Sequence, residues 1–184
     1  FLAERPRRGS GSVVTACMEG TRPLLVEVQA LVGPSPFGGT PRRQSTGVDS
    51  RRLAMILAVL EKRCGLQLQT QDIYVNVAGG VRIDEPGADL AVAVAVGSSL
   101  YNRAVDADTI IIGEIGLAGE VRSVPYGDIR LMEAAKLGFR RAIVPASVCQ
   151  SAAGSGLQLE LMAARSLGQS LELALPRLEN HRNV

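Results

Sequence analysis

DIYVNVAGGVRIDEPGADLAVAVAVGSSL, residues 72–100, places a candidate strand directly before an unusual helix. The run at 72–78 is rich in β-branched and aromatic residues and predicts a strand, which Gly79 and Gly80 extend or bend. Residues 87–100 present small or apolar side chains all round a helical wheel. A helix that is apolar on every side is buried, so we expect this one to lie at the centre of the domain.

On the N-terminal side, residues 23–32 (PLLVEVQALV) alternate well enough to predict a strand. Leu24, Val26 and Val28 would share one face, with Glu27 and Gln29 on the other. The following stretch, residues 33–47, holds three prolines and four glycines. It predicts a long loop, and loops of this length inside a compact domain are usually functional or mobile.

The next segment carries signals for a helix from about residue 50 to residue 64. Asp49 or Ser50 can cap its start, and Gly65 can end it. Four apolar residues recur at helical spacing and form the expected buried stripe: Leu53, Ile56, Leu57 and Leu60.

The C-terminal half predicts a mixture of strands and helices. Residues 109–115 and 119–124 are typical of a hairpin, with Gly116 and Gly119 near its turn. Strands are expected at 140–145 and 157–163, and helices at 127–137 and 166–175. The chain as a whole therefore predicts an α+β domain.

The composition of the 184 residues suits one domain, since 46% are hydrophobic. We expect residues 1–12 to be a linker, 13–176 the domain and 177–184 a frayed tail. No apolar run reaches the 18 residues that a membrane-spanning helix needs, so no membrane partner is expected. The three cysteines are far apart, which favours reduced thiols in the cytoplasm over disulfides.

Several kinds of chemistry lack the residues they need. Neither Lys62 nor Lys136 follows a glycine, so the chain has no Walker A phosphate loop. The single histidine, His181, lies in the expected tail, which argues against a Ser-His-Asp or Cys-His centre. One histidine and no cysteine cluster argue against a transition-metal site as well. We expect no cofactor in this chain.

The chain closely resembles the RadA/Sms family of bacterial DNA-repair proteins over residues 12–150. The resemblance lies in GTRPLLVEVQALV (20–32), TPRRQSTGVDSRRLAMILAVLEKRCGL (40–66), DIYVNVAGGVRIDEPGADLAVAVAVGSSL (72–100) and GEIGLAGEVRSVPYGDIRLMEAAKLGFRRAIVP (113–145). It implies the C-terminal domain of a DNA-dependent ATPase that drives branch migration of recombination intermediates. Residues 1–12 would then link it to an ATPase core, and zinc, ATP and Mg²⁺ would bind only in N-terminal parts of the parent.

The same stretch also resembles the proteolytic domain of Lon, which implies a sandwich of mixed sheet and helices, like ribosomal protein S5 domain 2. Lon cleaves peptides with a Ser-Lys dyad. Its serine lies in Gly-Pro-Ser-Ala-Gly, which matches residues 85–89 here, and its lysine matches the region of Asp128. Gly87 stands at the serine position. A glycine has no nucleophile and a carboxylate is not a neutral amine base, so peptidase activity is not expected. The resemblance further implies a homohexameric ring.

The best candidates for DNA contact are paired arginines. Residues 1–63 carry ten basic and five acidic residues, whereas residues 64–128 carry three and nine. Arg42 and Arg43 lie in the expected loop, and Arg51 and Arg52 lie where the next helix begins. There their charge opposes the helix dipole, which suggests an outside partner. Ion pairs across a subunit interface and a plain solvated face are the alternatives.

Three other arginines are weaker candidates: Arg82, Arg140 and Arg141. Phe37 and Tyr101 are isolated in the sequence, so no aromatic platform for bases accompanies the arginines. We therefore expect sequence-independent contacts to phosphates of single-stranded or branched DNA. A purely structural oligomerisation module without DNA contact is the alternative function.

Overall fold

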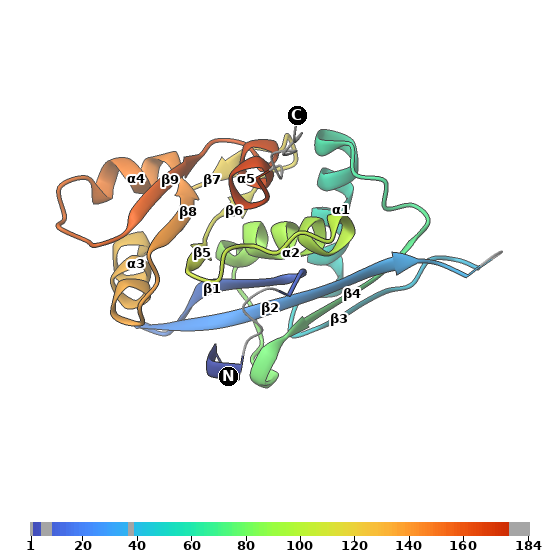
Figure 1. Cartoon of the computed structure of the whole chain (residues 1–184), viewed down its shortest axis with the longest axis horizontal. Coiled ribbons are helices and arrows are strands. Elements are labelled where there is room, and N and C mark those ends of the chain that lie inside the picture. Colours follow the sequence, from blue (N-terminus) through green and yellow to red (C-terminus); the bar gives the residue numbers. More distant parts are fainter. Residues whose placement is uncertain (1, 5–8, 37–38, 177–184) are drawn as a thin grey trace, which may run out of the picture.

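The structure is a computed structural model that describes residues 2–4, 9–36 and 39–176. Within these ranges the chain forms an α+β domain (Figure 1), as expected. Its main sheet has seven strands: β1 (Ser12–Glu19), β2 (Arg22–Pro34), β3 (Arg43–Thr46), β4 (Gln71–Val77), β5 (Thr109–Ile111), β8 (Arg141–Pro145) and β9 (Glu160–Ala164). Its α-helices are α1 (Ser50–Cys64), α2 (Asp89–Tyr101), α3 (Gly127–Lys136), α4 (Ala146–Ala152) and α5 (Leu167–Ala174).

The main sheet is mixed and has the order β3-β4-β2-β1-β5-β8-β9. Strand β2 pairs antiparallel with both β1 and β4, so that Val28 lies opposite Val13 on one side and Val77 on the other. The remaining pairs, β3 with β4, β1 with β5, β5 with β8 and β8 with β9, are parallel. A small second sheet pairs β6 (Glu114–Ile115) with β7 (Val121–Arg122).

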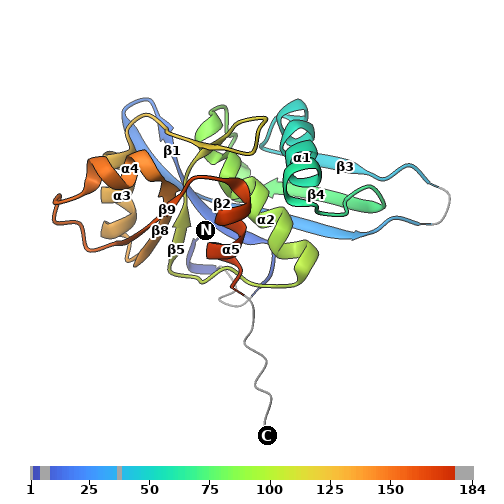
Figure 2. The same cartoon turned by 90° about the horizontal axis from the view of Figure 1, so that it is seen from above.

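Helices cover both faces of the sheet, but not along its whole width. Successive side chains of a strand point to opposite faces, and in β1 Val13 joins one core while Val14 joins the other. The first core packs α1, α2 and α5 against the sheet, and the second packs α3 and α4 against β1, β5, β8 and β9. Figures 1 and 2 show the two helix groups well apart.

Helix α1 has the bounds and caps that its sequence predicts. The Oδ1 atom of Asp49 accepts hydrogen bonds from the backbone N–H groups of Arg51 and Arg52, both at 3.0 Å. Gly65 ends the helix in the left-handed region, with φ 70°. All four residues of the predicted apolar stripe are buried. The two ends and the buried face of α1 therefore agree with the capping residues and the apolar spacing of its own sequence.

Helix α2 is the central helix that its small side chains predict. It follows a short 3-10 turn at Pro86–Ala88, and every residue from 89 to 99 is buried. A Cβ atom added to Gly97 would lie 2.8 Å from a Leu171 methyl group of α5. The small residues of α2 thus let strands and helices approach it closely from several sides.

Several predicted elements differ from those observed. The predicted hairpin was too large, because β5 joins the main sheet and only β6 and β7 pair. Strand β1 and helix α4 were not predicted, and β3 lies within the expected loop. On β2, Glu27 is buried rather than on a polar face, because its carboxylate accepts a 2.5 Å hydrogen bond from the Ser12 hydroxyl.

The ends of the expected domain are only partly described. A short 3-10 helix spans Leu2–Glu4, and β1 begins at Ser12, the last residue of the expected linker. The expected tail, 177–184, lies outside the described residues. Within the described ranges, no helix has the length and apolar character needed to cross a membrane.

Candidate functional site

The turn that leads into α2 brings Gly87 against an internal ion pair. The Gly87 carbonyl accepts a 2.9 Å hydrogen bond from the N–H of Gly113, which fixes the turn beside β6. A Cβ atom built on Gly87 would lie 3.2 Å from both Arg130 Nη1 and Glu85 Oε2. The space next to Gly87 is therefore filled by a guanidinium and a carboxylate.

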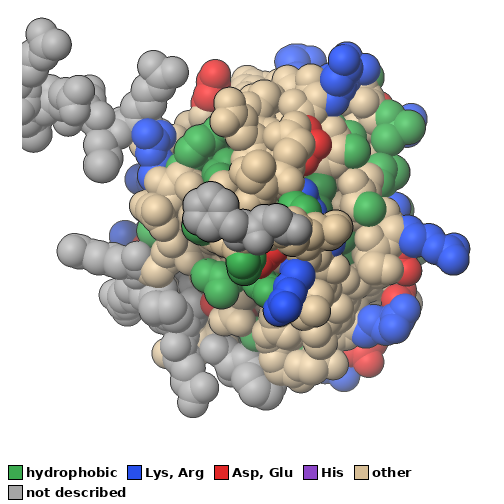
Figure 3. Space-filling model, turned by 90° about the vertical axis from the view of Figure 1, so that its right-hand side faces the viewer, with side chains coloured by type: hydrophobic (Ala, Val, Ile, Leu, Met, Phe, Trp, Pro, Cys, Tyr) green, Lys and Arg blue, Asp and Glu red, His purple; other side chains and the backbone are tan. Residues whose placement is uncertain are grey.

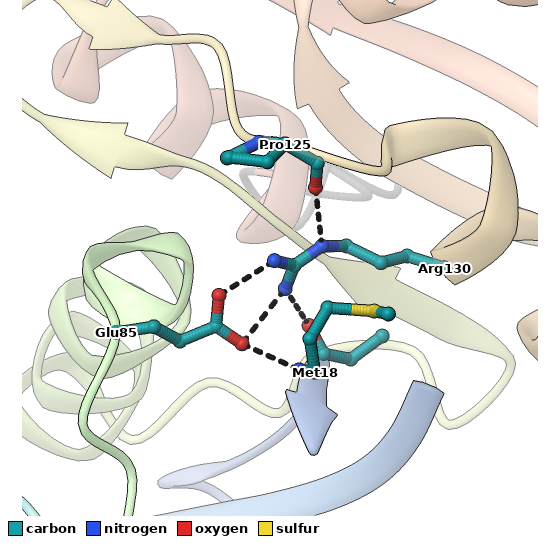
Figure 4. Close-up of polar contacts among 5 residues, drawn as sticks. Met18, Glu85, Pro125 and Arg130 are labelled. Atoms are coloured by element: carbon teal, nitrogen blue, oxygen red, sulfur yellow. Dashed lines mark hydrogen bonds and ion pairs between the residues drawn. The ribbon is translucent and has the colours of Figure 1, made fainter. Parts of the chain in front are cut away.

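Arg130 holds this centre together through four acceptors (Figure 4). Its Nη1 donates to the Ala16 carbonyl at 2.6 Å and to Glu85 Oε1 at 3.0 Å. Its Nη2 donates to Glu85 Oε2 at 2.5 Å, and its Nε donates to the Pro125 carbonyl at 2.9 Å. The Met18 N–H also donates to Glu85 Oε1, at 2.6 Å. With Arg130 only 1% exposed, the network ties β1, α3 and the turn before α2 together.

Sequence reasoning missed Arg130 and Glu85 and singled out Asp128 instead. Asp128 is exposed on the first turn of α3, two residues before the buried Arg130. A signal for Arg130 does exist in the sequence. It shares helical spacing with Ala134 and lies next to Leu131, both fully buried, so it falls within the apolar stripe of α3.

The chemistry available at this centre differs from that of a Ser-Lys dyad. A guanidinium stays protonated in proteins, so Arg130 cannot accept a proton from a nucleophile. The nearby Cys17 thiol is buried, and burial together with the Glu85 carboxylate raises its pKa to about 12. A thiol reacts as its thiolate, so Cys17 is unreactive near neutral pH. These groups are arranged to hold backbone segments in place.

A second internal pair involves Arg52, one of the predicted DNA-contacting arginines. Its Nε and Nη2 donate to the two carboxylate oxygens of Asp89, which is 2% exposed at the start of α2. The Ile115 N–H donates to the same carboxylate at 3.3 Å. Burial raises the pKa of Asp89, and the Arg52 guanidinium opposes that shift. Arg52 thus joins α1 to α2, and its charge is balanced inside the chain.

The other predicted arginines of the N-terminal third are exposed. Arg43 donates to the Leu68 carbonyl at 2.7 Å and lies 3.9 Å from the Glu61 carboxylate. The backbone N–H of Arg42 donates to Asp72 and holds the pKa of that carboxyl below its usual range, with help from the Ser35 hydroxyl. Among the described residues, Arg51 forms no ion pair.

The weaker candidates are paired with carboxylates or exposed near a strand end. Arg82 forms an exposed ion pair of 2.8 Å with Asp84. Arg141, at the start of β8, lies 3.2 Å from Asp106 and 3.4 Å from Glu160. Arg140 is exposed just before that strand.

The exposed face of α1 adds a cation that sequence reasoning did not select. Arg51, Ala54, Ala58 and Lys62 are exposed and recur at helical spacing. Arg51 and Lys62 lie about 16 Å apart along the axis, at a rise of 1.5 Å per residue. Figure 3 looks onto the end of the molecule that carries the connection between β2 and β3, and Lys and Arg side chains lie around its rim.

Comparisons with known proteins agree on the relationship of this chain. A family described as subunit ChlI of Mg-chelatase matches residues 43–148, more than half of the chain. The chain belongs to this ChlI family. It is also a homologue of the DNA repair protein RadA, with 57% identity over 145 residues to that of Halalkalibacterium halodurans and 53% over 147 residues to that of Bacillus subtilis. The RadA of Escherichia coli is 51% identical over 159 residues.

These alignments cover most of the chain and a smaller part of each relative. They take in 79%, 80% and 86% of this chain, but 32%, 32% and 34% of the respective RadA proteins. The chain therefore spans about a third of the length of the curated relatives it matches. As expected, this RadA homologue has a ChlI- or Lon-like α+β domain.

Among the residues that the structure describes, no group of three or more His, Cys, Asp or Glu side chains could hold a metal ion. The described part of the RadA homologue offers, among other features, two internal ion pairs and an exposed basic face on α1.

Proposed function

We propose that this chain is a non-proteolytic platform of a RadA-type repair protein in the cytoplasm, which assembles as a homohexamer and contacts DNA through phosphates. About half of its residues are identical to those of RadA proteins over most of its length. The parent would use ATP, in parts outside this chain, to drive branch migration of recombination intermediates. The contacts would not depend on base sequence.

The exposed face of α1 is the observation that carries the DNA contact. Arg51 and Lys62 have no ion-pair partner among the described residues, in contrast to Arg52. Ala54 and Ala58 lie between them and leave the helix surface low. A DNA strand carries a phosphate about every 3.4 Å of duplex axis, so the two cations can reach separate phosphates of one strand.

The absence of proteolysis is proposed from the centre at Gly87. That position lacks a nucleophile, and the nearest side chains are the Arg130 guanidinium and the Glu85 carboxylate. Both are engaged in hydrogen bonds to backbone groups of β1. The centre is built to stabilise the fold.

The test of the DNA contact removes the two cations of the basic face on α1, together with the exposed Arg42 that precedes β3, without touching the internal pairs. Arg42, Arg51 and Lys62 are changed together to Gln in the 184-residue chain. The matched control changes three exposed cations on other elements, Arg22, Lys136 and Arg165, to Gln. Binding of a labelled single-stranded oligonucleotide is followed by fluorescence anisotropy at several salt concentrations.

We expect the triple variant to bind more weakly than the wild type and than the control. The slope of log affinity against log salt should fall by about 2, since each lost phosphate contact on a single strand accounts for about 0.7. Equal binding and equal slopes for the two triple variants would contradict the proposed contact on α1.

A purely structural oligomerisation module is the second candidate, and one observation favours it. Leu31 of β2 lies on the sheet face turned away from α1 and α2, and its side chain is 67% exposed. This exposed apolar side chain could contact a second copy of the chain. Mass measurement in solution, with and without single-stranded DNA, separates the two functions. A hexamer that retains no DNA at any salt concentration would favour the structural module.

A further inference from the structure

A hollow of about 800 Å³ lies where α1, α2 and α5 meet. Its apolar lining is formed by Leu66, Leu171 and Leu175. Its polar lining includes Arg63, Tyr101 and Arg103. The volume lies within the range of small-molecule sites, about 300 to 1,000 Å³. The lining combines an apolar surface, an aromatic ring and two guanidinium groups.

The Arg103 side chain lies over the Tyr101 ring, a contact that the sequence did not reveal. Asn102, between them, ends α2 in the left-handed region with φ 51°. The N–H of Arg103 then donates to the Ser98 carbonyl at 3.0 Å, so the chain turns back. The Arg103 guanidinium carbon lies 5.9 Å from the centre of the Tyr101 ring. Tyr101 has no aromatic neighbour in the sequence, but in the structure the Arg103 side chain lies over its ring.

Part of the Tyr101 ring remains accessible to a ligand. It is 47% exposed, although Arg103 lies over it. Aromatic rings of this kind stack with the bases of single-stranded nucleic acid, and arginine adds a cation–π contribution. The pair therefore supplies a platform for a base.

Arg63 completes the hollow from the last turn of α1. A Cβ atom on Gly119 would lie 3.1 Å from Arg63 Cβ, so the backbone at Gly119 packs on the base of the arginine side chain. Its Nε donates to the Leu117 carbonyl at 3.4 Å. Among the described residues Arg63 has no carboxylate within ion-pair distance. Of the described residues that line the hollow, Glu172 alone is acidic, so these residues together carry a net charge of +1.

We propose that this hollow binds one nucleotide unit, with its base against Tyr101 and its phosphate against Arg63 or Arg103. The proposal rests on the proposed DNA contact in one respect. Lys62 of the basic face immediately precedes Arg63, so a strand that follows α1 from Arg51 would reach the hollow at its end. Bases of a duplex are already stacked within the helix and cannot enter. The hollow would thus select single strands over duplex.

The test exploits the absence of tryptophan, because the intrinsic fluorescence then comes from three tyrosines. Tyr101→Leu removes the ring, Tyr101→Phe retains it, and Tyr126→Leu is the control at an exposed tyrosine outside the hollow. Thermal unfolding checks that each variant is folded. Two ligands are titrated into each protein, a single-stranded oligonucleotide of thymidines and the free mononucleotide dTMP.

We expect the oligonucleotide to quench part of the wild-type tyrosine fluorescence and to lose this effect in Tyr101→Leu but not in Tyr126→Leu. Affinity for the single strand should fall roughly tenfold in Tyr101→Leu, as for the loss of one base–aromatic stack, and recover in Tyr101→Phe. Affinity for duplex should be unchanged. Saturable quenching by dTMP in place of the oligonucleotide would assign the hollow to a free nucleotide.

The remaining outcomes separate this proposal from the DNA contact on α1. If Tyr101→Leu binds and quenches like the wild type while the Arg42, Arg51 and Lys62 variant is weakened, the hollow is overturned and the basic face stands. If neither ligand quenches Tyr101, the nucleotide site is overturned. Binding of a labelled acidic peptide that Tyr101→Leu abolishes, without nucleotide binding, would also overturn it.

Discussion

Arg130 and Glu85 form a two-armed ion pair, with Nη2 2.5 Å from Oε2 and Nη1 3.0 Å from Oε1. The two residues are 45 positions apart in the chain. The Arg130 guanidinium is buried, while the Glu85 side chain is about a quarter exposed. A charge of this kind is tolerated in the interior because every arm of the guanidinium has an acceptor.

Glu85→Ala should therefore destabilise the fold strongly. Arg130 would keep its charge and lose its counter-ion, and breaking a buried pair on one side costs about 3–5 kcal/mol of unfolding free energy. Glu85→Gln, which keeps a side-chain acceptor, should lose less. Urea unfolding measures both. The comparison is Asp106→Ala, which breaks an exposed pair with Arg141 and should cost about 0–1 kcal/mol; equal losses would show that the internal pair has no special weight.

Restoring the two dyad residues should not restore a protease. In a protein with Gly87→Ser and Asp128→Lys, the new Ser Cβ would meet Arg130 and Glu85 at 3.2 Å. We expect casein hydrolysis to stay at the background of the wild-type chain. Cleavage that appears in this protein, and that disappears when Gly87→Ala replaces Gly87→Ser, would refute the expectation.

Tyr126→Gly should stabilise the chain by about 1 kcal/mol. Tyr126 precedes α3 with φ 59°, a left-handed conformation that costs a non-glycine residue about 1–2 kcal/mol. Its ring is largely exposed, so little packing is lost with it. Thermal unfolding of Tyr126→Gly and Tyr126→Ala provides the measurement. An equal effect of the two substitutions would mean that backbone strain is not the cause.

Cys17 should make stability fall above pH 9. Burial raises the pKa of its thiol from the ordinary 9.0 to about 12. Between these values the unfolded chain loses the thiol proton and the folded chain keeps it, so the unfolded state gains about 1.4 kcal/mol per pH unit. The stabilisation is complete below pH 9 and is lost towards pH 12. Unfolding free energies from pH 8 to 10.5 should decline more steeply for the wild type than for Cys17→Ala; parallel curves would contradict this.

Local signals carried much of the fold prediction. Helix α1 was predicted with its bounds because Asp49 and Gly65 act within one turn of its ends. Strand β1 escaped prediction because Val13 and Val14 are both buried, in different cores, so the strand has no polar face to alternate with. An alternation of apolar and polar residues identifies only those strands that have one buried and one solvent-exposed face.

The candidate sites depended on long-range pairing and were less predictable. The sequence shows that Arg52 opposes the dipole of α1, but it does not show that Asp89, 37 residues away, balances it. Arg63 and Tyr101 meet in one hollow only because two helices end side by side. The arginines in the sequence suggested contact with phosphates. Only the tertiary structure shows which of them are paired internally and which are exposed.

The sharing of β1 between two cores has a mechanical consequence. Val13 packs with α1 and α2, and its neighbour Val14 packs with the core of α3 and α4. The two layers of helices are therefore packed on opposite faces of one and the same strand. With a DNA strand bound along α1, as proposed, a displacement of that layer would act through β1 on the layer of α3 and α4.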